Sequence, residues 1–177
     1  MKSSDLSDVR VIAFATHGLV PGDLNGLTQP ALAMSSPQVT QDGGDGLLTM
    51  GEILELQLDA DWVVLSACNT GAADGEGAEA VSGLGRAFFY AGTRALLASN
   101  WPVYSEATRD LTTNLFQLQK RHGPARAEAL RRAMVSLIDG PGYRGADGRT
   151  VFSYAHPIFW APFSLIGDGG GGVPAIH

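Results

Sequence analysis

The chain has 177 residues, of which 45% are hydrophobic, so it can bury a core of ordinary size within one domain. Its formal net charge of −6 argues against a nucleic-acid-binding protein that relies on neutralising phosphates. A single cysteine excludes an intramolecular disulfide framework, and one Cys with four scattered His lacks the paired spacing of a zinc site. We therefore expect a reducing, cytoplasmic setting, and no apolar run of membrane-spanning length appears.

The first third of the chain contains one expected strand, a long loop and a short helix. An apolar run over residues 9–15 predicts a buried strand, and His17-Gly18 follows it. Residues 19–48 are rich in glycine and proline, which predicts a long loop, and residues 31–34 within it can pair as a short ribbon. A capping-box sequence then begins a short helix over about residues 49–57.

The middle of the chain contains two further expected strands around a helix. Residues 62–67 begin with Trp, Val, Val and Leu, a run that suits a strand covered on both faces, and Cys68 follows among turn residues. Helical spacing of apolar residues predicts a helix over roughly 77–91 that Gly92 terminates. Residues 94–99 read as a third buried strand.

The last part of the chain is expected to be mainly helical. Ser105 is predicted to cap a helix that stops at Gly123, and a second helix follows over about 124–140. A glycine-rich loop over 140–150 and a last strand over 156–167 complete the chain. Alternating strands and helices in this order predict an α/β domain with a mostly parallel sheet.

Basic residues gather on the second of these helices. They are Arg126, Arg131 and Arg132, and a solvated helix face explains them more simply than a nucleic-acid contact.

Two chemically capable side chains each follow a buried strand: His17 and Cys68. If the two strands are parallel neighbours, the imidazole and the thiol emerge at the same sheet edge. A histidine beside a thiol raises its thiolate fraction and can then protonate a leaving amine. The backbone N–H groups of Gly18 and Cys68 could hold an oxyanion. The alternatives are that Cys68 is a small buried core residue and His17 a loop histidine.

Several short sequence motifs around these residues occur in a fixed order. They are Phe14-Ala-Thr-His-Gly18, Asp45-Gly-Leu-Leu-Thr49, Val63-Val-Leu-Ser-Ala-Cys-Asn-Thr-Gly71, Gly75-Glu-Gly77, Ala87-Phe-Phe-Tyr-Ala-Gly92, Ser99-Asn-Trp-Pro-Val103 and Trp160-Ala-Pro-Phe163. Together they resemble the CHAT domain, a caspase-like family usually found behind tetratricopeptide repeats. His17 precedes Cys68 by 51 residues, and caspases have a similar separation of about 50.

The resemblance implies a three-layer caspase-like α/β fold, with a mostly parallel central sheet and helices on both faces. It also implies a cysteine endopeptidase that cleaves protein substrates without a metal or organic cofactor. His17 matches the family's catalytic histidine and Cys68 its nucleophile. The backbone N–H groups of Gly18 and Cys68 match its oxyanion hole.

Substrate-binding positions follow from the same resemblance. Ser66 matches the family position whose residue faces the pocket for the substrate side chain that precedes the cut bond. Ser99, Asn100 and Trp101 match the segment that pairs with the substrate as an added strand. This chain departs from the family at Tyr104-Ser105, where acidic residues are usual after the Trp-Pro-Val word.

The resemblance also sets the expected boundaries and partners. We expect a frayed lead over residues 1–8, a CHAT domain over 9–168 that lacks the family's first strands, and a glycine-rich tail over 169–177. The expected partners are a protein or peptide substrate and an upstream tetratricopeptide-repeat domain, without nucleic acid or membrane. A catalytically inactive or partner-dependent scaffold module remains the alternative.

Overall fold

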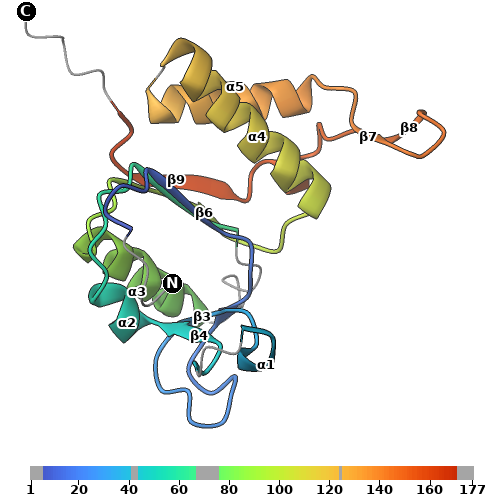
Figure 1. The fold of residues 1–177 in the computed structure, drawn as a ribbon. Coiled ribbons are helices and arrows are strands. Elements are labelled where there is room, and N and C mark those ends of the chain that lie inside the picture. The colour runs from blue at the N-terminus through green and yellow to red at the C-terminus, as the bar shows by residue number, and fades with distance from the viewer. Residues whose placement is uncertain (1–5, 41–43, 67–75, 124, 171–177) are drawn as a thin grey trace, which may run out of the picture. The chain divides into compact units, whose positions relative to one another are not determined.

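The computed structural model describes residues 6–66, 76–123 and 125–170, with a gap at 41–43 (Figure 1). The chain divides into two compact units, Met1–Pro102 and Val103–His177. The first unit holds a parallel sheet with helices and a ribbon, and the second holds a helical pair with short strands.

A parallel sheet organises the first unit. Its strands β1 (Val11–Phe14), β5 (Trp62–Leu65) and β6 (Ala95–Ser99) are neighbours in that order, with Phe14 opposite Leu65. Every residue of β5 and β6 is buried, as expected for parallel strands covered on both faces. The predicted α/β fold with a mostly parallel central sheet is confirmed.

One face of this sheet packs against α2 (Met50–Leu54) and α3 (Glu76–Tyr90). Phe88 of α3 is fully buried in this core, where each large apolar side chain contributes roughly 1.5–3 kcal/mol. Gly85 allows a close approach, because a Cβ there would lie 3.1 Å from Leu96 Cδ2. The strand residues in this core are Ile12, Phe14, Val63, Leu65, Leu96 and Ala98.

A small antiparallel sheet lies within the segment predicted as a long loop. In it, β3 (Ala31–Ala33) pairs with β2 (Gly18–Leu19) on one side and β4 (Leu47–Thr49) on the other. The ribbon predicted at residues 31–34 is therefore confirmed. A short helix, α1 (Pro37–Thr40), lies between β3 and β4.

Exposed ion pairs connect the amino ends of the three parallel strands. Arg10 contacts Asp61 at 2.8 Å and Asp59 at 3.3 Å, and Arg94 reaches Asp61 at 3.5 Å. All four side chains are partly in water, so each pair contributes only about 0–1 kcal/mol. The sheet therefore depends mainly on its buried apolar residues.

The second unit is built on the helices α4 (Ser105–His122) and α5 (Arg126–Ile138), which pack against each other. Gly123 ends α4 in the left-handed conformation with φ 53° and donates its N–H to Gln119 at 3.0 Å, which confirms the predicted stop. Within the described ranges, no helix is both long and apolar enough to cross a membrane.

The start of α2 agrees with the prediction and the start of α4 does not. Thr49 and Glu52 form the predicted capping box. Ser105 was expected to be a cap, but it is the first helical residue, and Tyr104 is the N-cap without a side-chain hydrogen bond. The Tyr104 ring packs on Phe159 with centroids 4.9 Å apart. The spacing of apolar residues along a helix does not predict such a tertiary contact.

The predicted glycine-rich loop over 140–150 is wrong in part, because it contains a hairpin. Here β7 (Tyr143–Arg144) pairs antiparallel with β8 (Thr150–Phe152). Gly148 adopts φ 76° in the connecting turn, where the Asp147 carboxylate accepts the Arg149 N–H at 3.1 Å.

The strand predicted over 156–167 is confirmed only in its second part. A 3₁₀ turn, η1 (Pro157–Phe159), precedes a shorter strand, β9 (Phe163–Gly167). The His156 side chain accepts the N–H of Ile158, which caps the turn. The two prolines in this segment lack the N–H that a strand ladder requires.

The arginines of α5 form local ion pairs. Arg131 and then Arg132 hydrogen-bond to Glu128, and these bonds lower the pKa of its carboxyl to about 2. Arg126 pairs with Asp168 at 2.8 Å. The predicted solvated helix face fits the exposed Arg131 and Arg132 but not Arg126, whose side chain is only 13% exposed.

A tight turn joins α3 to β6 at Gly92. Its φ is 109°, and a Cβ there would lie 2.0 Å from the Leu58 carbonyl oxygen. Leu58 in turn donates its N–H to Ala91 at 2.7 Å, so the two backbone segments cannot separate without losing that bond.

We predict that Gly92→Ala lowers the free energy of unfolding by more than about 3 kcal/mol, because backbone strain adds to the overlap with Leu58. Gly22→Ala is the matched control, since Gly22 has φ 93° with open space around its Cβ position. It should cost only about 1–2 kcal/mol. Urea unfolding of both variants measures the difference, and equal losses would contradict the overlap argument.

Candidate functional site

The carboxyl ends of the three parallel strands lie at one edge of the first unit's sheet. Phe14, Leu65 and Ala98 are level across β1, β5 and β6. The strands that precede His17 and Cys68 are therefore parallel neighbours, which is the condition for bringing the two residues to one sheet edge. Open α/β sheets bind their ligands at this edge, so the residues that follow each strand are the candidates for chemistry.

His17 lies directly after β1, with a fixed backbone and an exposed ring. Its carbonyl oxygen accepts the N–H of Ala33 at 2.9 Å. The hydroxyl of the preceding Thr16 donates to the Ala33 carbonyl, and the buried Gly18 pairs with Leu32 in the ribbon. No described residue hydrogen-bonds to the imidazole, so the ribbon holds the chain on both sides of the ring and leaves the ring accessible.

Sequence patterns alone did not reveal the role of Thr16. Its position between a buried strand and a histidine was the available signal, since threonine hydroxyls often bond to nearby backbone. Its partner, Ala33, lies 17 residues further along the chain, beyond the reach of local patterns.

Ser66 follows β5 at the same edge and is tied to β1. Both its N–H, at 3.1 Å, and its hydroxyl, at 3.2 Å, donate to the carbonyl oxygen of Phe14. These bonds extend the β1–β5 pairing by one residue beyond Leu65. The hydroxyl that we expected to face a substrate side chain is thus engaged with the neighbouring strand.

The residues expected to pair with a substrate leave β6 at this edge. Ser99, the last strand residue, is only 1% exposed, whereas Trp101 is 38% exposed and Asn100 is also accessible. A ligand at this edge could therefore reach the Asn100 and Trp101 side chains but not that of Ser99.

Cys68 and its N–H lie outside the described residues, within the gap at 67–75. The histidine side of the site is therefore described, whereas the expected nucleophile is known only from its position in the sequence. In the part of the chain that the structure describes, no three His, Cys, Asp or Glu side chains gather closely enough to hold a metal ion.

Comparisons with known proteins agree with the family resemblance of the sequence motifs. The model of the CHAT domain family matches residues 1–168. Tetratricopeptide repeat protein 28 of Homo sapiens is 27% identical over 192 residues, which covers 93% of this chain and 7% of that protein. Tetratricopeptide repeat protein 28 of Mus musculus is 30% identical over 123 residues, which covers 69% of this chain and 4% of that protein. The chain spans less than a tenth of the length of either relative.

We predict that Thr16→Val lowers the free energy of unfolding by about 1 kcal/mol, because the Ala33 carbonyl loses its hydroxyl donor. Thr16→Ser keeps the hydroxyl and should stay within about 0.5 kcal/mol of the unchanged chain. Urea unfolding gives the stabilities, and amide exchange at Ala33 should be faster only in the valine variant. Equal behaviour of the two variants would show that the hydroxyl does not hold this segment.

Proposed function

The chain belongs to the CHAT domain family, and on this premise we propose that it is a cysteine endopeptidase with Cys68 and His17 as its catalytic dyad. The observation that carries the proposal is the register of two strands. Phe14 pairs with Leu65, and His17 and Cys68 each follow three residues after their member of that pair. Equal offsets on adjacent parallel strands favour an imidazole and a thiol at one sheet edge.

The described end of β5 also supports the proposal. Ser66 is anchored to Phe14, and Cys68 is two residues further along the chain. Two residues of extended chain span at most about 7 Å. This short span supports the proposal of a dyad at the edge where His17 is exposed.

In the proposed mechanism, the Cys68 sulfur attacks the carbonyl carbon of the peptide bond. The N–H groups of Gly18 and Cys68 stabilise the tetrahedral oxyanion. His17 takes the thiol proton and gives it to the leaving amine, which releases the first product and leaves a thioester. Water, deprotonated by His17, then hydrolyses the thioester and restores the thiol.

The proposed substrate is a protein or peptide segment in an extended conformation. It would pair along residues 99–101, with Asn100 and Trp101 offering accessible side chains next to it. Ser66 lies between this segment and β1, which suits a position beside the side chain before the cut bond.

A non-catalytic interaction module is the second candidate. It is favoured by one observation: both matching relatives are named for tetratricopeptide repeats, and this chain corresponds to a small part of each. In that case the domain would bind a repeat-containing partner, and Cys68 would be an ordinary thiol.

We predict that a peptide acyloxymethyl ketone labels the chain at Cys68, the only cysteine that it contains. Cys68→Ala should abolish labelling. His17→Ala should slow it by about 10²-fold or more, the usual contribution of general acid–base catalysis. His156→Ala, which removes an exposed histidine of the second unit, is the matched control and should label normally.

The two candidates differ in the intrinsic reactivity of the thiol. A dyad thiol should react with iodoacetamide at pH 6 faster than glutathione does, because more of it is thiolate. Reaction at the glutathione rate, unchanged by His17→Ala, would contradict the peptidase proposal and favour the interaction module.

A further inference from the structure

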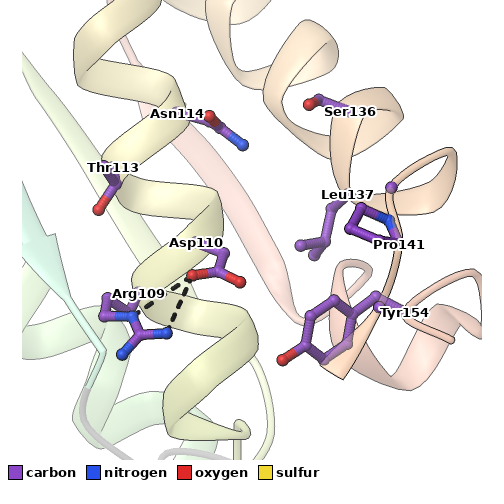
Figure 2. A pocket seen from close by; sticks show the side chains of 10 residues that line it. Arg109, Asp110, Thr113, Asn114, Ser136, Leu137, Pro141 and Tyr154 are labelled. Atoms are coloured by element: carbon purple, nitrogen blue, oxygen red, sulfur yellow. Dashed lines mark hydrogen bonds and ion pairs between the residues drawn. The ribbon is translucent and has the colours of Figure 1, made fainter. Parts of the chain in front are cut away.

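A pocket of about 500 Å³, lined by both polar and apolar groups, lies within the second unit. Residues of α4, the end of α5 and the segments on either side of the β7–β8 hairpin line this open pocket (Figure 2). Its volume falls in the range of small-molecule sites. Its wall carries a carboxylate from Asp110, an amide from Asn114 and hydroxyls from Ser136 and Tyr154.

Tyr154 presents its hydroxyl to this pocket. The residue is 3% exposed, and its hydroxyl makes no hydrogen bond with any described residue. Phe152 and Phe159 hold its ring at centroid distances of 5.8 and 5.2 Å, and the hydroxyl points across the pocket toward α4 (Figure 2). Because the hydroxyl borders the open space of the pocket, it is available to a ligand.

The charges around the pocket favour a cation. One oxygen of Asp110 contacts Arg109 at 3.3 Å, and the other points into the pocket (Figure 2). The end of α5 adds the partial negative charge of a helix carboxyl terminus. Arg109 is the opposing charge, but its side chain is 72% exposed and lies at the rim.

The raised pKa of Tyr154 also indicates that negative charge dominates around the pocket. Burial raises this pKa first, and the carboxylates of Asp110 and Glu106 raise it further, with Arg109 opposing. The carboxylates thus have the larger influence at the depth of the hydroxyl.

We propose that this pocket binds an organic cation, a guanidinium or primary ammonium group on an alkyl stem, with Asp110 as its counter-ion and the Tyr154 hydroxyl as an acceptor. Such groups carry only donors, so they require the acceptors that line this wall. Charge-assisted bonds to Asp110 would supply most of the affinity, and Leu137 would contact the stem. The proposal is independent of Cys68 and of peptidase activity.

The same cationic group can come from a free amine or from a basic side chain of a peptide. Butylguanidinium and its neutral isostere butylurea test the free group. Acetyl-Gly-Arg-Gly-amide and the matching citrulline peptide test the side chain. Calorimetric titration of the full chain at low salt should show each cation binding at least about tenfold more tightly than its neutral isostere.

Variants then separate the cation site from a general loss of structure. Asp110→Asn should weaken cation binding at least about tenfold, and Tyr154→Phe, which keeps the ring, about two- to tenfold. Arg109→Gln should instead tighten it by about two- to fivefold, because an internal competitor for Asp110 is removed. Asp8→Asn, an exposed carboxylate of the first unit, is the matched control and should change nothing.

The gain expected for Arg109→Gln is the sharpest part of the test, since structural damage would only weaken binding. Equal binding of cations and neutral isosteres overturns the proposal, and so does unchanged affinity in Asp110→Asn. Binding of both cations supports a site that recognises the group itself, whereas binding of the arginine peptide alone supports one that also contacts the peptide backbone.

Discussion

The parallel, in-register pairing of β1 with β5 and of β5 with β6 is the constraint on which the first unit depends. Alternate residues of these strands form the core against α2 and α3, so a slip of one residue would turn that apolar set to the opposite face. The same slip would also remove the equal offsets of His17 and Cys68 from the Phe14–Leu65 pair. Burial of the core thus sets the alignment on which the proposed dyad relies.

Rigid backbone and accessible side chains occur side by side at the carboxyl edge of this sheet. Thr16 and the His17 carbonyl bind the ribbon strand β3, and Ser66 binds the end of β1. These contacts use backbone and hydroxyl groups, which leaves the His17 imidazole exposed. Such an arrangement suits the proposed role of His17, because an anchored backbone reduces the cost of orienting its ring.

The second unit presents a different kind of site. A carboxylate of α4 and the phenol of Tyr154 face one pocket, and an aromatic cluster holds the phenol in place. The Arg109–Asp110 pair at its mouth is exposed and therefore weak, so Asp110 can exchange that partner at little cost. One chain thereby combines a candidate nucleophilic edge with a proposed cation site, and the two can be tested separately.

The sequence by itself determined the elements whose signals are local. Apolar runs predicted the three parallel strands. The Thr49 capping box and Gly123 predicted helix ends, and the ordered motifs indicated the family. Only the tertiary structure decided what depends on distant partners. Tyr104, which packs on Phe159, is the N-cap of α4 instead of the expected Ser105. Strand pairing forms the hairpin of β7 and β8. The pocket joins Asp110, Ser136 and Tyr154, which no helical or strand period relates, because their proximity arises only when α4, α5 and the hairpin region pack together.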